Sequence, residues 1–101
     1  MVVLVTCPSK VVARRIAAEL GNHRLAACVN MAPSIESIYR WQGKIEHARE
    51  VLLVIKTTAA GFNRLKRYII ALHPYDVPEV IGVLVTAGHS PYLQWVSKNT
   101  R

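Results

Sequence analysis

Long hydrophobic runs are missing from this sequence of 101 residues. Its apolar runs, such as Val51–Ile55, fall far short of the ~20 residues that a membrane-spanning helix needs, so we expect no membrane partner. No basic and apolar stretch typical of a secretion signal precedes the first strand-like run, which favours a cytoplasmic protein. Cysteine is also scarce, because Cys7 and Cys28 are the only two and their spacing fits neither a disulfide framework nor a zinc motif.

Acidic residues are few as well. The chain has 6 Asp and Glu against 13 Lys and Arg, a net charge of +7. Basic residues such as Arg64, Lys66 and Arg67 fall where a predicted helix faces solvent, so we interpret the excess as a solvated surface. An RNA-binding sheet would need exposed aromatic residues on its central strands. Val2–Thr6 and Val51–Ile55 contain none, and we therefore expect no nucleic-acid partner.

Catalytic motifs are absent too. The sequence contains no GxSxG elbow, no phosphate-binding P-loop, no GxGxxG after the first strand and no HExxH. Glu50 and Lys56 lie on a predicted strand of mixed polarity, and their separation gives no reason to pair them as acid and base. We therefore expect that the protein is not an enzyme.

The most informative feature that is present is one long β-hairpin. Residues 25–56 predict two runs of about fifteen residues that fold back at Gln42-Gly43, where glycine supplies the positive φ of a tight turn. This register pairs Trp41 with Lys44 and Tyr39 with Glu46. At ~3.3 Å per residue each arm would span about 50 Å, whereas a domain of this size has a radius of gyration of ~13 Å. The hairpin must therefore extend beyond its own domain.

A hairpin of this length needs other protein chains to cover it. An isolated two-stranded hairpin is marginally stable in water, and exposed apolar residues along it invite pairing with another chain. We therefore expect a homo-oligomer in which neighbouring subunits cover the hairpin. The aromatic residues, Tyr75 included, fit an interface or a core better than a ligand-stacking pocket. The expected interface residues are Tyr39, Trp41, Lys44, Glu46, Tyr92 and Trp95.

The rest of the chain predicts two similar units and a final helix. Right-handed crossovers between them give an α+β fold, a ferredoxin-like βαββαβ sandwich in one domain over residues 1–101, with a long extended hairpin and a short C-terminal helix. The expected elements are a strand over Val2–Thr6, a helix capped by Ser9 and closed by Gly21, strands over Leu25–Met31 and Ile45–Lys56, a helix capped by Thr57 or Thr58 and stopped at His73 by Pro74, a strand over Val80–Val85, and a helix capped by Ser90.

Four residues are candidate metal ligands: His73, Asp76, Glu79 and Cys28. Imidazole and thiolate suit copper and zinc, and a carboxylate can complete such a site. A tight turn between Pro74 and Pro78 would bring His73 and Glu79 into one cleft. Alternatively, His73 caps the end of its helix, and Cys28 is a small core residue within its strand.

Five blocks of the sequence resemble the CutA divalent-cation tolerance proteins, and together they cover essentially the whole chain. The resemblance implies a cytoplasmic homotrimer of ferredoxin-like domains whose long hairpins pair with neighbouring subunits. It also implies tolerance to copper or another divalent metal ion and binding of that ion, with no metal required for folding. The blocks are Leu25–Asn30, Ser37–Glu46, Leu53–Thr57, His73–Glu79 and Tyr92–Trp95.

A second function stays open at this point. The CutA trimers are similar in architecture to the P-II nitrogen-signalling trimers. This similarity raises the alternative of a signalling trimer that binds a small anionic metabolite between subunits through Arg or Lys side chains.

Overall fold

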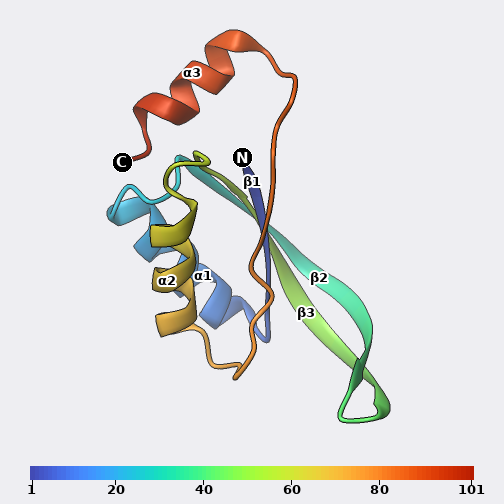
Figure 1. The fold of residues 1–101 in the computed structure, drawn as a ribbon. Helices are drawn as coiled ribbons and strands as arrows, with labels where there is room; N and C mark the ends of the chain where they lie inside the picture. The colour runs from blue at the N-terminus through green and yellow to red at the C-terminus, as the bar shows by residue number, and fades with distance from the viewer.

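The protein, described over residues 1–101 by a computed structural model, folds into a four-stranded sheet and three helices (Figure 1). The strand order is β2-β3-β1-β4, and each neighbouring pair is antiparallel. This arrangement is the predicted βαββαβ order with a final helix. The elements are β1 (Val2–Cys7), α1 (Lys10–Asn22), β2 (Cys28–Trp41), β3 (Lys44–Lys56), α2 (Phe62–Leu72), β4 (Ile81–Val83) and α3 (Ser90–Lys98).

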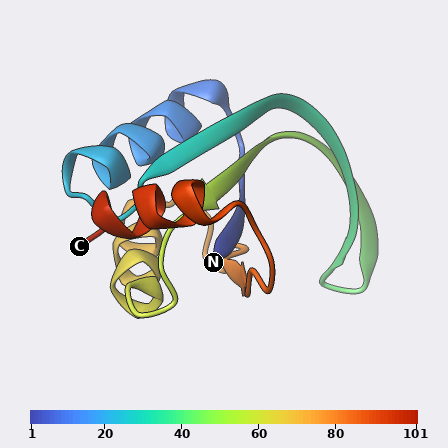
Figure 2. The ribbon, with the colours of Figure 1, turned by 90° about the horizontal axis from the view of Figure 1, so that it is seen from above.

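The hydrophobic core lies between the sheet and the helix pair α1 and α2, which cover one face of the sheet (Figures 1 and 2). Alternate residues of β1 point into this core, because successive side chains of a strand face opposite sides. Val3, Val5 and Cys7 are fully buried there, against Ile16 of α1 and Ile69 of α2. None of the three helices is both long and apolar enough to cross a lipid bilayer.

The hairpin of β2 and β3 is confirmed in its turn and register. Gln42 and Gly43 have φ angles of 51° and 78°, and Trp41 pairs with Lys44 as Tyr39 does with Glu46. The register shifts once, between Ala32 and Ile35. The ribbon bends away from the sheet (Figure 2), so the longest dimension of the molecule is 44 Å and the straight arm of about 50 Å was an overestimate.

The ends of α1 and α2 differ from their predicted caps. Ser9 accepts a hydrogen bond from the Val12 N–H, as expected, but α1 runs past Gly21 to Asn22. The N-cap of α2 is Gly61 rather than a predicted threonine, although the Thr58 hydroxyl accepts from the Gly61 N–H at 3.1 Å in the turn just before the helix. The Thr57 hydroxyl is instead buried and donates to the Leu25 carbonyl at 2.8 Å. The tertiary contact therefore replaces the local cap.

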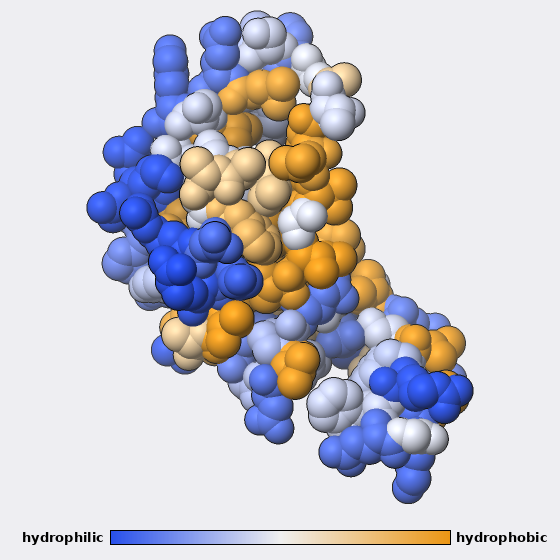
Figure 3. Space-filling model, in the orientation of Figure 1, coloured by the Kyte–Doolittle hydropathy of each residue, from blue (hydrophilic) through white to orange (hydrophobic).

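The C-terminal third is more exposed than its apolar sequence predicts. The strand expected over Val80–Val85 shortens to β4, and every residue from 81 to 85 is exposed. Hydrophobic side chains therefore gather along the middle of the face shown in Figure 3, where β4 and the segment after it cross the molecule. The N-cap of α3 is His89, one residue before the predicted Ser90.

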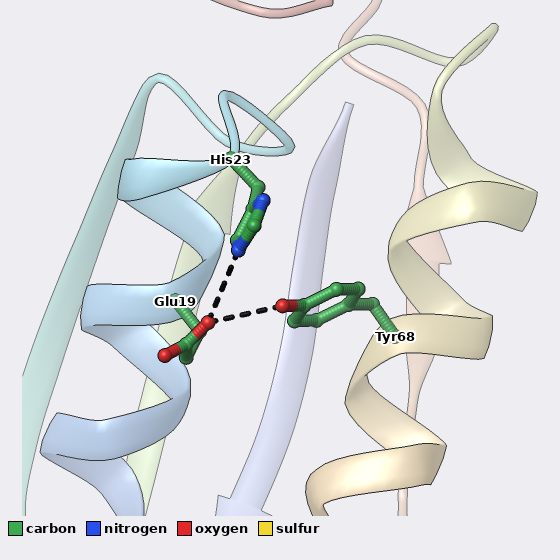
Figure 4. Close-up of polar contacts among 3 residues, drawn as sticks. All are labelled: Glu19, His23 and Tyr68. Carbon is green, nitrogen blue, oxygen red and sulfur yellow. Dashed lines mark hydrogen bonds and ion pairs between the residues drawn. The ribbon is translucent and has the colours of Figure 1, made fainter.

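A polar contact joins α1 to α2 on the side away from the sheet. Figure 4 shows the Glu19 carboxylate between His23 and Tyr68. The Tyr68 hydroxyl donates to Glu19 Oε2 at 3.0 Å, and His23 Nε2 lies 3.2 Å from the same oxygen. This hydrogen bond raises the pKa of Tyr68, because the carboxylate stabilises the protonated phenol.

Candidate functional site

A groove of about 670 Å³ opens between the hairpin and the loop that follows α2. Its size is within the range typical of ligand-binding pockets. Four of the chain's 6 acidic residues line it, and no Lys, Arg or His does, although the whole chain carries a net charge of +7. The four are Glu36, Glu50, Asp76 and Glu79. The groove is therefore a region of concentrated negative charge on a basic protein.

Glu50 is the most deeply placed of these carboxylates. It lies on β3, pairs with Ile35 of β2, and is only 8% exposed. The Tyr75 hydroxyl donates to Glu50 Oε2 at 2.8 Å. Burial raises the pKa of Tyr75, and the hydrogen bond to Glu50 raises it further. Tyr75 therefore stays a protonated donor that holds the Glu50 carboxylate in place.

His73 fixes the loop that carries Tyr75. Its imidazole is buried and uses both nitrogens: Nε2 donates to the Thr6 carbonyl at 2.8 Å, and Nδ1 accepts from the Tyr75 N–H at 3.2 Å. The Tyr75 N–H requires an acceptor at Nδ1, so the proton of a neutral ring is on Nε2. His73 thus ties the start of the loop to the end of β1.

Three aromatic side chains form walls of the groove: Tyr39, Trp41 and Tyr75. Tyr39 and Trp41 are two residues apart on β2 and point to the same side of the ribbon. Glu50 shares that side, because it stands opposite Ile35 and residues 35, 37, 39 and 41 alternate with those of the other face. These three side chains line the groove of the single chain, and their expected place in an interface or a core stays a prediction.

Cys7 lies behind the groove in the core. Burial raises the pKa of its thiol from 9.0 to about 11, and the nearby Glu50 charge adds to the increase. The group is therefore a protonated thiol at neutral pH, without the thiolate character that metal binding or nucleophilic chemistry needs.

The predicted metal ligands are separated in this structure. Glu79 and Asp76 line the groove, whereas His73 lies buried beside it with both ring nitrogens hydrogen-bonded. Cys28 is the first residue of β2 rather than a mid-strand residue, is half-buried, and lies outside the groove. No three His, Cys, Asp or Glu side chains of the chain are gathered closely enough to hold one metal ion. Sequence reasoning missed Glu50 and Glu36, whose approach to the loop depends on the fold.

The predicted interface residues all lie on the surface. Tyr39 and Trp41 are on the hairpin, Lys44 and Glu46 are on the opposite arm, and all four are exposed. In α3, Tyr92 and Trp95 stack with ring centroids 5.7 Å apart.

Comparison with known proteins identifies relatives of the whole chain. The family described as CutA1 divalent ion tolerance protein matches residues 1–99. The divalent-cation tolerance protein CutA of Thermus thermophilus is 50% identical over 99 residues, which cover 98% of this chain and 96% of the relative. Human Protein CutA is 50% identical over 95% of this chain, but the chain spans only 54% of that relative's length.

Solved structures agree with this result. The divalent cation tolerance protein of Thermus thermophilus matches with a TM-score of 0.97, covering 99% of this chain and 97% of the other. CutA1 of Oryza sativa matches with a TM-score of 0.96 at 44% identity, covering 99% of this chain and 92% of the other. The names of relatives differ in compartment: the Arabidopsis thaliana protein is called chloroplastic and the Archaeoglobus fulgidus protein periplasmic.

Proposed function

Because this chain belongs to the CutA1 divalent-ion tolerance family, we propose that it acts in metal tolerance by binding divalent cations in the groove. The observation that supports this proposal is that four carboxylates, and no basic side chain, line one groove of a basic protein. Carboxylate oxygens are ligands for divalent cations. The family is described as a tolerance protein and not as an enzyme.

The acting unit in this proposal is a homotrimer. One chain gathers no complete set of ligands, so a bound ion needs side-chain movement or groups from a neighbouring subunit. The exposed apolar residues of the hairpin, among them Ile38 and Ile45, give a neighbouring subunit a surface to cover. We place the trimer in the cytoplasm, in keeping with two cysteines that are both free.

Copper is the first ion to test, with Cys28 and His73 as separate candidate ligands, because Cys28 lies near Val2 at one end of β1 and His73 contacts Thr6 at the other. Carboxylates alone suit harder ions, whereas copper binds thiolate and imidazole well. Cys28 is half-buried and accessible to a ligand role. His73 would have to give up a hydrogen bond to Thr6 or Tyr75 before it coordinated an ion.

The signalling alternative does not suit this groove. A small anionic metabolite would need Arg or Lys side chains to bind it. The lining instead contains four carboxylates and none of those residues. The charge of the groove thus favours a cation.

Calorimetric titration of the purified protein with Cu²⁺ and with Mn²⁺ tests the proposal. The double variant Asp76→Asn, Glu79→Gln should weaken binding of the ion, whereas Glu19→Gln removes the same kind of charge on α1, outside the groove, and should leave binding unchanged. Cys28→Ser should weaken Cu²⁺ binding selectively if the thiol is a ligand. Unaltered titrations in all the groove and cysteine variants would remove the proposed site.

A further inference from the structure

Residues 84–101 contribute no side chain to the hydrophobic core. They contain α3 and the connection that leads to it, and in Figure 1 α3 stands at one end of the molecule, beyond the layer of α1 and α2. Val96 is the one buried residue of α3, and it lies outside the core, while Tyr92 and Trp95 are exposed. Apolar burial therefore contributes little to holding this segment in place.

Arg24 makes both hydrogen bonds that join this segment to residues 1–83. Its guanidinium donates to the Lys98 carbonyl at 3.0 Å, and its own carbonyl accepts from the Arg101 N–H at 2.8 Å. Lys98 is the last residue of α3, so its carbonyl is one of those without a partner inside the helix. The helix dipole also favours a positive charge at that end. One residue of the turn between α1 and β2 thus holds the far end of α3.

The backbone at Arg24 has a conformation that arginine adopts at a cost. Its φ is 56°, in the left-handed region. It follows α1 at the point where the Leu25 N–H returns to the Leu20 carbonyl at 2.9 Å, a helix ending that usually contains glycine. Glycine would relieve the strain and keep the turn, but it has no guanidinium. A strained residue that also makes the connecting contacts indicates a function beyond ending the helix.

We propose that residues 84–101 form an arm that opens and closes as one unit on a protomer that stays folded, with Arg24 as its latch. The closed latch fixes the direction of α3 and with it the position of Tyr92 and Trp95, which are expected in the subunit interface. An open latch therefore weakens association with a second copy of the chain. This last step rests on the assembly in the proposed function, whereas the latch itself does not, and neither depends on metal binding.

Hydrogen exchange of backbone amides, followed by mass spectrometry, tests the latch. In Arg24→Gly the amides of α3 should exchange about tenfold faster than in the parent, because a charge-assisted hydrogen bond is lost. The amides of the buried strand β1 should exchange no faster, since glycine relieves the strained backbone. If Arg24 acted only through its backbone, glycine would leave α3 unchanged and slow the exchange of the rest of the protein.

Two further variants separate the latch from a general loss of charge. Arg24→Lys keeps a positive donor on a long side chain and should restore most of the protection of α3. Arg67→Gln removes one positive charge at an exposed position of α2 and should leave the exchange of α3 unchanged. Sedimentation over a dilution series should show weaker association for Arg24→Gly than for either of these variants.

The possible outcomes are distinguishable. Unchanged exchange of α3 in Arg24→Gly would overturn the latch. Equally faster exchange in α3 and β1 would overturn it too, because the variant would then have destabilised the whole fold. Faster exchange confined to α3 with unaltered association would contradict the link to assembly. A parent protein that stays monomeric would contradict the trimer of the proposed function, and the exchange of α3 would still decide the latch.

Discussion

The Thr57 hydroxyl is a single polar group whose burial links distant parts of the chain. It is 1% exposed and donates to the Leu25 carbonyl at 2.8 Å. Thr57→Val keeps the shape but leaves that carbonyl without its donor, so the free energy of unfolding should fall by about 1–2 kcal/mol. Urea unfolding measures the change. Thr57→Ser retains the hydroxyl and should lose less, and Thr86→Val, at an exposed position, should be nearly neutral.

Cys7 makes stability depend on pH in the alkaline range. Its pKa is raised from 9.0 to about 11 in the folded protein, so the unfolded chain releases the thiol proton first. The stabilisation is complete below pH ~9 and is lost as the pH rises through about 11, with a slope of up to about 1.4 kcal/mol per pH unit.

Urea unfolding at several alkaline pH values under reducing conditions measures that slope. Cys7→Ala should flatten it between pH ~9 and ~10, since alanine has no proton to lose; above pH ~10 the raised pKa values of Tyr68 and Tyr75 keep a slope of the same sign. Val5→Ala removes a buried side chain from the same strand without removing an ionisable group. It should lower stability but keep the slope of the parent. Parallel slopes for the parent and Cys7→Ala would contradict the assigned role of the thiol.

At the scale of elements, the hairpin turn depends on two residues with positive φ. Gly43 has open space around the position of a Cβ, so Gly43→Ala should be destabilising only through its backbone angle of 78°, by about 1 kcal/mol. Gln42→Asn should instead stabilise by about 0.5 kcal/mol, because Asn-Gly suits this turn and asparagine tolerates a φ near 51°. Paired urea-unfolding curves with unchanged m-values measure both effects.

The hairpin was predictable from sequence because its determinants are local. Gln42-Gly43 specifies the turn, and the turn fixes the register of every pair up to the shift at Ala32. The caps of α2 and the length of β4 were not predictable in this way. Thr57 has a distant partner in Leu25, and only Ile81–Val83 finds a neighbour in β1. Tertiary contacts decided both outcomes.

The acidic residues of the groove were likewise predictable only where the sequence signal was local. Asp76 and Glu79 were identified because they stand between prolines in a short loop next to an apolar strand. Glu50 was set aside as one residue of a mixed strand. Its hydrogen-bond partner Tyr75 is 25 positions away, on a loop that His73 ties to β1. No local pattern contains that information.

At the scale of the whole molecule, the chain presents apolar residues on two separate regions. One is the hairpin, and the other is the segment from β4 into α3, where Leu84 is 66% exposed. The face in Figure 3 places the second region along the middle of the molecule. Two distinct apolar regions on one chain allow a head-to-tail contact that closes into a ring, as a trimer requires.

Trp41 at the hairpin tip tests that assembly. Its side chain is 45% exposed in the single chain, so truncation removes little from the fold of one protomer. If a neighbouring subunit covers it, Trp41→Ala should weaken association by about 2–4 kcal/mol, more than it lowers protomer stability. Sedimentation over a dilution series measures the association. Val11→Ala removes an apolar side chain that is 76% exposed on α1 and should leave association intact. A Trp41→Ala protein that dissociates no more readily than its parent would contradict the trimer built on this hairpin.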